Sequence, residues 1–322
     1  MFASPGDIAF SIGSLPIYYY GIIMAASISL GIFTANLIAK KYYPEINAEV
    51  IYDISPYLII GAIIGARLYY CLLSFKYFIT NPLEIIQLWH GGISIHGAIL
   101  GGLIAGIIYA KRNKLPILKL CDIFSYGLIL GQALGRWGNF FNSEAFGRPT
   151  ENFLKLYIPI YKRPLQYLQC DYFHPTFLYE SILDICIFLI LFFIIRKITS
   201  HLFTFSPSHP KITSNVTLNS IQGRICELPC DAESTSQAKA VAVNFDSVSA
   251  TAYVSSARRD DGIIFFSYLI LYSIARIIIE QVRIDSVLNI FGVPIAQVVS
   301  VIIILIASFG IFRLIRNKNV KY

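Results

Sequence analysis

Long apolar segments alternate with short polar ones along most of the chain. Seven of these segments approach or exceed the roughly 20 mostly apolar residues that a membrane-spanning helix needs. They are Ile17–Ala39, Tyr52–Leu73, Ile93–Ala110, Leu118–Trp137, Pro175–Ile195, Ile263–Val282 and Val293–Ile315. The third is the shortest and begins inside a glycine-rich stretch. The pattern predicts an all-α polytopic membrane protein with seven transmembrane helices.

The composition supports a membrane protein and excludes two other classes. Of the 322 residues, 56% are hydrophobic and 14% are charged, whereas soluble domains carry about 25% charged residues. The chain is too apolar to be a disordered protein, and as a soluble globule it would expose large apolar patches. Its formal net charge of +7 comes from short basic clusters between the apolar runs. That distribution predicts loops beside membrane lipids and no nucleic-acid partner.

The basic clusters also predict the orientation. With seven spans, most of them fall on one side of the membrane, which the positive-inside rule assigns to the cytoplasm. They contain Lys40, Lys41, Lys111, Arg112, Lys114, Arg196, Lys197, Arg258, Arg259, Arg313, Arg316, Lys318 and Lys321. The N-terminus is then expected outside and the C-terminus in the cytoplasm.

This topology divides the chain into three parts. Residues 1–198 hold the first five helices, with a small external cap at about 138–174. Residues 199–261 are rich in Ser, Thr, Asn and Ala and have no sustained helical period. They are expected to form a polar cytoplasmic insertion that is partly disordered or has a few short strands. Residues 262–322 hold the last two helices and a basic tail.

Ionisable side chains inside the predicted spans are few, and each is a candidate for function because a charge in a bilayer is costly. The most informative of them are Arg67, His96, Arg136, Glu180, Asp184, Arg276 and Glu280. In the predicted topology most of them, together with Tyr20 and Asn139, lie near the outer ends of their helices. The sequence therefore predicts a polar site at the outer membrane interface.

For two arginines, Arg136 and Arg276, the spacing of neighbouring residues allows more than one role. Tyr272, Arg276 and Glu280 follow one another at four-residue steps and share a helix face. The Arg276–Glu280 pair could be a structural clamp or part of a site. Arg136 has no acid within reach on its own helix, so it could bind a lipid phosphate or extend its guanidinium to water.

His96 has two possible roles. A single histidine in a helix is often a hydrogen-bonded structural residue, whereas polar groups at the same depth favour a general base.

Several segments resemble one known family. The stretch ALGRWGNFFNSEAFGRPT, residues 133–150, resembles the signature of the prolipoprotein diacylglyceryl transferases. Five further segments resemble this family in the same order along the chain. They are LPIYYYGIIM, GARLYY, NPLEIIQLWHGGISIHGAILGG, HPTFLYES and YSIARIIIEQVRID. The insertion at 199–261 departs from the family, which usually has a short basic turn there.

The resemblance implies a function and a set of site residues. The family transfers the diacylglyceryl group of phosphatidylglycerol to the thiol of the lipobox cysteine in the signal peptide of a bacterial prolipoprotein. Glycerol phosphate is released, and the reaction is the first step of lipoprotein maturation at the outer face of the cytoplasmic membrane. The family's site positions correspond here to Tyr20, His96, Arg136, Asn139, Glu144, Gly147, Tyr272, Arg276 and Glu280. Arg67 is added as a further candidate ligand of phosphatidylglycerol.

The reaction explains why these residue types are needed. A thiol with a pKa of about 8.5 is mostly protonated at neutral pH, so a base is required. His96 is the first candidate and Glu280 the second. Arg136 and Arg276 are expected to stabilise the leaving phosphate. No metal and no cofactor are expected. A small transporter or channel and a non-catalytic lipid-binding scaffold remain the alternatives.

Overall fold

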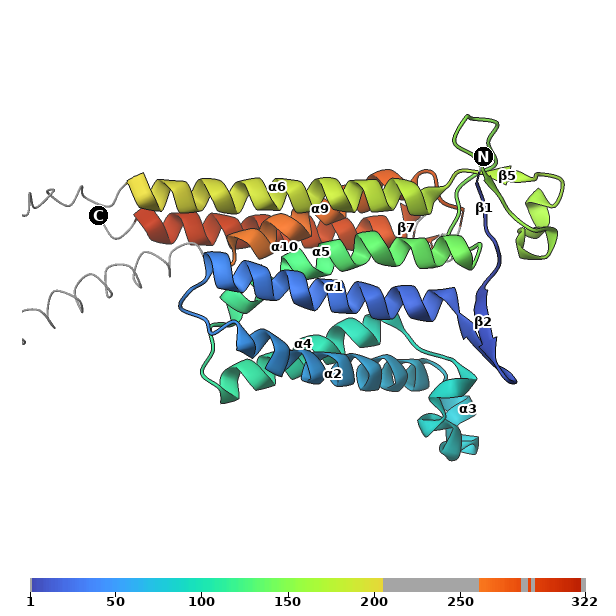
Figure 1. Ribbon diagram of the computed structural model, residues 1–322, viewed down its shortest axis with the longest axis horizontal. Helices are drawn as coiled ribbons and strands as arrows, with labels where there is room; N and C mark the ends of the chain where they lie inside the picture. The colour runs from blue at the N-terminus through green and yellow to red at the C-terminus, as the bar shows by residue number, and fades with distance from the viewer. Residues whose placement is uncertain (1, 205–260, 285–288, 291–292, 320–322) are drawn as a thin grey trace, which may run out of the picture.

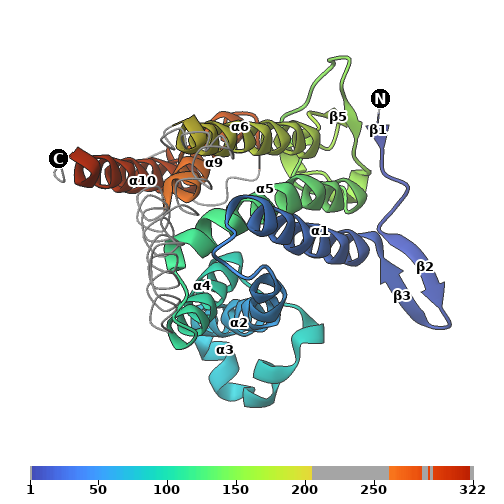
Figure 2. The same cartoon turned by 60° about the vertical axis from the view of Figure 1, so that its left-hand side comes forward.

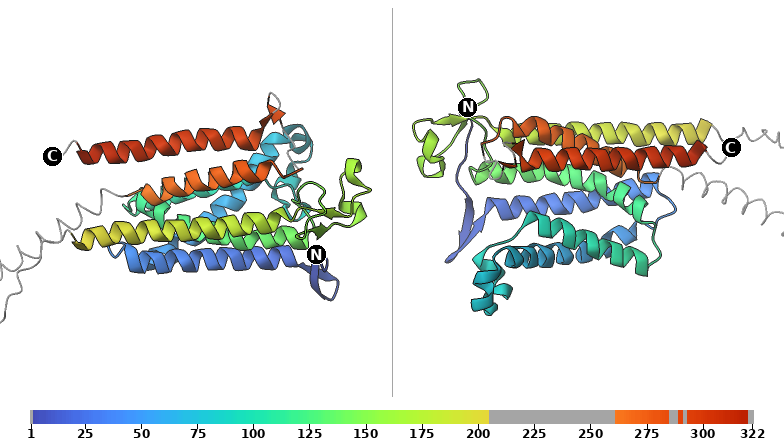
Figure 3. Two further views of the ribbon diagram at one scale, coloured as in Figure 1. Left: turned by 90° about the horizontal axis from the view of Figure 1, so that it is seen from above. Right: turned by 180° about the vertical axis from the view of Figure 1, so that it is seen from behind.

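The computed structural model describes residues 2–204, 261–284, 289–290 and 293–319, and seven long helices dominate these ranges. They are α1 (Tyr19–Tyr42), α2 (Glu49–Leu73), α4 (Ile95–Arg112), α5 (Ile117–Phe141), α6 (Thr176–Thr204), α9 (Ile263–Glu280) and α10 (Ile295–Asn319). They run side by side along one direction (Figure 1, Figure 3). Each predicted span corresponds to one helix. The sequence places the helices correctly because an apolar segment of this length satisfies its backbone polar groups within a helix.

Six of the helices in the described ranges are long and apolar enough to cross a membrane: α1, α2, α5, α6, α9 and α10. The remaining long helix, α4, has 18 residues and ends on Lys111 and Arg112. It corresponds to the shortest predicted span. The all-α class and the multi-pass architecture are confirmed, and six helices meet the requirements for spanning.

The helices pack in pairs through glycines. Gly61 and Gly65 of α2 face Gly97 and Gly101 of α4 so closely that a Cβ atom on Gly65 would overlap the Gly97 carbonyl oxygen. The same contact joins α1 to α5, where a Cβ on Gly31 would lie 2.8 Å from the carbonyl oxygen of a facing glycine. Small residues four apart allow helix backbones to approach this closely in membranes. Figure 2 shows α1 and α5 between the α2–α4 pair and the group of α6, α9 and α10.

Short strands cover one end of the bundle, which is the cap end. β1 (Phe2–Ala3), β4 (Leu156–Tyr157) and β5 (Tyr172–Phe173) form one sheet, with β1 parallel and β5 antiparallel to β4. β2 (Ile8–Ile12) and β3 (Leu15–Tyr18) form a hairpin that leads into α1, and β6 (Asn289–Ile290) pairs with β7 (Val293–Pro294) before α10. A small apolar core of Phe146, Leu156, Ile158, Phe173 and Phe177 holds the segment between α5 and α6 together.

Two boundaries differ from the prediction. α5 continues to Phe141, so the cap segment begins a few residues later than 138. α6 continues to Thr204, so the first residues assigned to the insertion are helical. The rest of the insertion, 205–260, lies outside the described residues.

The segment between α2 and α4 lies at the cap end and exposes apolar side chains. It contains α3 (Phe75–Thr80) and two 3-10 turns, Pro82–Ile86 and Leu88–His90. Leu83 and Trp89 are 74% and 75% exposed. Residues 81–92 form these two turns and no continuous helix, because Pro82 starts a new turn and Gly91 adopts a positive φ of 79°.

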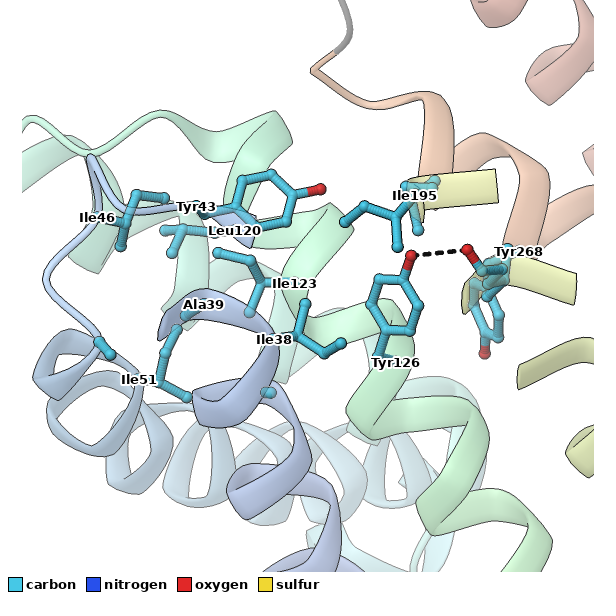
Figure 4. Close-up of a cluster of buried hydrophobic side chains, with 14 of the residues drawn as sticks. Ile38, Ala39, Tyr43, Ile46, Ile51, Leu120, Ile123, Tyr126, Ile195 and Tyr268 are labelled. Atoms are coloured by element: carbon cyan, nitrogen blue, oxygen red, sulfur yellow. Dashed lines mark hydrogen bonds between the residues drawn. The ribbon is translucent and has the colours of Figure 1, made fainter. Parts of the chain in front are cut away.

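The opposite end of the bundle contains the larger apolar cluster. Ile38, Ile123 and Tyr126 pack there between α1 and α5 (Figure 4). The buried Tyr126 hydroxyl donates a hydrogen bond of 2.9 Å to the Leu191 carbonyl oxygen of α6.

A buried carboxylate fixes the start of α9 at this end. Asp122 of α5 accepts hydrogen bonds of 2.7 Å from the backbone N–H groups of Gly262 and Phe265. These are N–H groups that the first turn of a helix leaves without intrahelical partners. Asp122 thus fixes the position of α9 along the axis of α5. It therefore also fixes the position along that axis of the charged residues near the far end of α9.

Replacing Gly65 with leucine is expected to destabilise the protein by about 1–3 kcal/mol or more, because the contact with α4 has no room for a side chain. The measurement is the thermal unfolding midpoint of the purified protein in detergent. Gly21→Leu is the matched control, since nothing lies within 4 Å of a Cβ at Gly21. An equal effect of the two substitutions would contradict the close α2–α4 contact.

Candidate active site

Three helices bring charged residues together at the cap end. α5 and α9 end there and α6 begins there. Arg136 lies in the last two turns of α5, Glu180 in the second turn of α6, and Arg276 one turn before the end of α9. The predicted gathering of polar side chains near one end of the bundle is therefore present for these residues.

Glu180 is the centre of this cluster. Its carboxylate is buried, and Oε2 lies 2.6 Å from Arg136 Nε. Oε1 lies 3.0 Å from Arg283 Nη1 and 3.4 Å from Arg276 Nη1. One carboxylate thus contacts three guanidinium groups from two neighbouring helices and the segment after α9. Charged groups arranged in this way tolerate burial because the opposite charges compensate one another.

A second carboxylate, that of Glu280, compensates the charge of Arg276. Glu280, which is buried, places Oε2 2.8 Å from Arg276 Nη2. Arg136 Nη2 donates a hydrogen bond of 3.3 Å to the hydroxyl of Tyr272. The predicted common face of Tyr272, Arg276 and Glu280 is confirmed, and this face is turned towards Arg136.

A small cavity opens among these side chains. Its lining combines charged and apolar residues from the three helices: Arg136, Glu180, Leu183, Asp184, Tyr272, Ala275, Arg276 and Ile279. A pocket with two guanidinium groups in its wall can bind a phosphate, because arginine presents several N–H donors to phosphate oxygens. No group of three side chains suited to holding a metal ion occurs in the part of the chain that the structure describes.

The signature segment after α5 folds back over the site. Ser143 and Ala145 have positive φ values of 48° and 53°, which turn the chain sharply. Gly147 has no room for a side chain, since a Cβ there would lie 2.8 Å from His174 Cβ and 2.9 Å from a methyl group of Val282. The glycine therefore allows the signature segment to pack between the start of α6 and the end of α9.

Two other members of the signature shape its turn. The backbone carbonyl of Asn139 accepts a hydrogen bond of 3.0 Å from the N–H of Glu144. The Glu144 carboxylate is exposed and accepts a bond of 3.4 Å from the side chain of Asn142. The Asn139 side chain is half-buried.

His174 joins the signature segment to α6. Its carbonyl accepts a hydrogen bond from the N–H of Gly147 at 2.9 Å, and its Nδ1 lies 3.1 Å from the hydroxyl of Tyr179. Burial lowers the pKa of His174 below its usual range.

Tyr20 lies beside the site on α1. Its ring packs against Gly138 of α5, where an added Cβ would come within 2.8 Å of the ring. Arg136 and Glu144 are both within electrostatic range of its hydroxyl. The structure therefore brings Tyr20 near the cluster.

His96 and Arg67 are not in contact with the cluster in the described residues. His96 is exposed at the start of α4, with its ring centroid 6.1 Å from that of Tyr69. The Arg67 guanidinium is buried and donates to the backbone carbonyls of the segment between α2 and α4. Its acceptors are Ile85 at 3.0 Å, Gly92 at 2.8 Å and Gln87 at 3.2 Å, together with Glu84 and Gly91. Arg67 thus holds this segment in place, and a role in lipid binding stays a prediction.

Sequence reasoning did not single out the central position of Glu180, nor the parts played by Asp184 and Arg283. All three are visible in the sequence as charges in or next to an apolar run. The signal that could have marked Glu180 is that Arg136 has no acid on its own helix and must find one on another. Which helix supplies it depends on packing.

These features define a multi-pass, mostly helical membrane protein with a buried cluster of arginine and carboxylate side chains near one end of its bundle. Comparison with known proteins extends this assignment. Residues 7–208 and 242–313 match the family described as prolipoprotein diacylglyceryl transferase. Residues 209–241, within the predicted insertion, are not matched.

Individual relatives agree with the family match. The phosphatidylglycerol–prolipoprotein diacylglyceryl transferase of Synechococcus elongatus is 39% identical over 320 residues, which cover 99% of this chain and 90% of the relative. That of Thermosynechococcus vestitus is 34% identical over 313 residues, 97% of this chain and 94% of the relative. The Nostoc enzyme is 48% identical over 191 residues, 59% of this chain and 67% of the relative. The chain belongs to the prolipoprotein diacylglyceryl transferase family, which confirms the resemblance and the assignment as a transferase.

Replacing Glu180 with glutamine is expected to lower the free energy of unfolding by about 3–5 kcal/mol, because it leaves buried guanidinium groups without their carboxylate. Thermal unfolding in detergent measures this change. Glu151→Gln is the control, since Glu151 is 89% exposed and pairs with Lys155 on the surface, where a pair contributes about 0–1 kcal/mol. An unchanged midpoint for Glu180→Gln would contradict the central role of this carboxylate.

Proposed function

We propose that the chain transfers the diacylglyceryl group of phosphatidylglycerol to the lipobox cysteine of a bacterial prolipoprotein. A carbon–sulfur bond forms between the cysteine and the glyceryl carbon that carries the phosphate. The carbon–oxygen bond to the phosphate breaks, and glycerol phosphate leaves with the electron pair. The thiol proton passes to a base. The family match and the names of the relatives support this reaction.

The observation that carries the proposal is that Arg136 and Arg276 line the same cavity. The leaving phosphate gains negative charge as the carbon–oxygen bond breaks. Two guanidinium groups already held in place by Glu180 and Glu280 stabilise that charge without rearranging. Preorganised donors of this kind are worth a few kcal/mol of barrier each.

Asn139, Glu144, Gly147, Tyr20 and Tyr272 complete the phosphatidylglycerol site in this proposal. Tyr272 is bonded to Arg136, and Tyr20 lies within its electrostatic range. The signature turn that contains Asn139 and Glu144 lies at the same end of the bundle. Gly147 acts through packing, because it lets this turn approach α6 and α9.

His96 is the proposed base. Glu280 is buried and engaged with Arg276, which suits a carboxylate that orients the arginine. The imidazole of His96 is exposed at the cap end, where an incoming cysteine can reach it. Histidine is the side chain that most often acts as a general base near neutral pH.

We also propose that α4 spans the membrane as a seventh helix. It packs against α2 over its length through Gly97 and Gly101, and its basic C-terminal pair lies at the same end of the bundle as Lys40 and Lys41 of α1. By the positive-inside rule that end is cytoplasmic. The cap end and the N-terminus then face the outside of the bacterial cytoplasmic membrane, and Thr204 at the end of α6 lies on the cytoplasmic side.

The arrangement does not favour a carrier. Carriers bind their substrates near the middle of the membrane, often at broken helices. In this protein the arginine–carboxylate cluster lies near one end of α5, α6 and α9, and these helices are continuous. The relatives named above are transferases.

Purified protein is expected to transfer the diacylglyceryl group from phosphatidylglycerol to a lipobox peptide, as measured by a mobility shift or a lipid label. Arg136→Ala is expected to lower the rate by about 100- to 1000-fold, because it removes a donor to the leaving phosphate. Arg112→Ala, at the opposite end of the bundle, is the control. Absence of transfer by the folded unmodified protein would refute the proposed function, whereas normal transfer by Arg136→Ala would refute only the phosphate role.

His96→Gln is expected to abolish most activity at pH 7 and to regain part of it at pH 9. A thiol with a pKa near 8.5 increases its thiolate fraction about 25-fold between these values, which lessens the need for a base. The measurement is the pH–rate profile of the variant beside that of the unmodified protein. His90→Gln, in the exposed turn preceding α4, is the control. A variant with no regained activity at pH 9 would assign the base elsewhere.

A further inference from the structure

One buried carboxylate of the site is not used by the chemistry described above. Asp184 lies one turn beyond Glu180 on α6, on the side away from the cap, and is 2% exposed. It lines the same cavity as Arg136, Tyr272 and Arg276. Because α6 begins at the cap end, Asp184 forms the deeper part of this cavity.

Asp184 differs from the other two carboxylates in how its charge is compensated. Glu180 and Glu280 each lie within 2.6–2.8 Å of a guanidinium nitrogen. Asp184 Oδ2 is fully buried and has no hydrogen-bond partner among the described residues. A buried acceptor without a donor is unfavourable, and such atoms are rare in native proteins. The position therefore calls for a donor from a ligand.

We propose that Asp184 binds a hydroxyl of the glycerol headgroup and selects phosphatidylglycerol among anionic phospholipids. This inference rests on the proposed function. In it, the headgroup phosphate lies against Arg136 and Arg276, and its terminal glycerol reaches the deeper part of the cavity, where a hydroxyl donates to Asp184 Oδ2.

The geometry suits a short polyol attached to a phosphate. Side chains at i and i+4 on one helix face are separated by about 6 Å. Glu180 marks the level of the arginines and Asp184 the level one turn deeper. This separation is comparable with the reach of a three-carbon headgroup beyond its phosphate.

The charges of the cavity favour a hydroxyl over other donors. A carboxylate repels phosphate oxygens, so the group beside Asp184 must be a hydrogen-bond donor. An ammonium headgroup is also a donor. The lining holds Arg136 and Arg276 together with Glu180 and Asp184, so its charges already balance. A neutral hydroxyl satisfies Oδ2 without taking a further charge out of water, which an ammonium group would require. A site built to bind a hydroxyl discriminates strongly against an analogue that lacks it.

The test compares two lipid donors that differ only in these hydroxyls. Phosphatidylglycerol and phosphatidylpropanol carry the same phosphodiester charge when made with identical acyl chains. The kcat/KM for transfer to a lipobox peptide is measured with each lipid. The unmodified protein is expected to prefer phosphatidylglycerol by roughly 10- to 100-fold. Asp184→Leu is expected to reduce this preference to about threefold or less while transfer from phosphatidylpropanol continues.

Two further variants separate recognition from folding. Asp184→Asn keeps a carbonyl acceptor and is expected to retain an intermediate preference. Asp53→Asn changes an exposed aspartate of α2 outside the cavity and is expected to leave the preference unchanged. Thermal unfolding of all variants shows that they are folded.

Two results would overturn the inference: equal use of both lipids by the unmodified protein, or an unchanged preference in Asp184→Leu. Either would indicate that Asp184 binds only water. If the folded protein transfers from neither lipid, the proposed function fails. Native mass spectrometry of the two bound lipids then decides the Asp184 inference separately, with equal binding counting against it.

Discussion

The carboxylate of Glu180 is the point on which the charged site depends. Three arginines lie in a setting where an unpaired charge is costly, and they are held there because Glu180 contacts all of them. The contacts fix the ends of α5 and α9 against the start of α6. The same ion pairs that make the charges tolerable also orient the guanidinium groups, so stability and preorganisation have one source.

Contacts elsewhere in the fold hold the helices that carry these charged residues in their relative positions. Asp122 holds the beginning of α9 against α5 through two backbone hydrogen bonds. This sets how far Arg276 extends towards the cap end, about three and a half turns later. The glycine contact between α1 and α5 brings Tyr20 against Gly138 near the site. At the cap end, Gly147 lets the signature turn close over the helix ends. The site is therefore supported from both ends of the bundle.

Much of the site follows from sequence periodicity, and part of it does not. The shared face of Tyr272, Arg276 and Glu280 is predictable because residues four apart on a helix are neighbours. The partner of Arg136 is not predictable in this way, since Glu180 lies on a different helix. For Arg67 the sequence predicts a site residue, because a charge lies inside an apolar segment. In the structure its guanidinium donates to the backbone carbonyls of the segment that follows α2.

The sequence by itself determined the helices, because about 20 consecutive apolar residues leave few alternatives to a helix in a membrane. It also determined that Arg136, Arg276 and Glu280 lie near one end of the bundle and, through ordered motifs, the family. Only the tertiary structure decided which carboxylate compensates which arginine, and that Asp184 Oδ2 is left without a donor. These are contacts between helices far apart in the chain. They depend on how glycines and caps set the helices against one another, which local periodicity does not record.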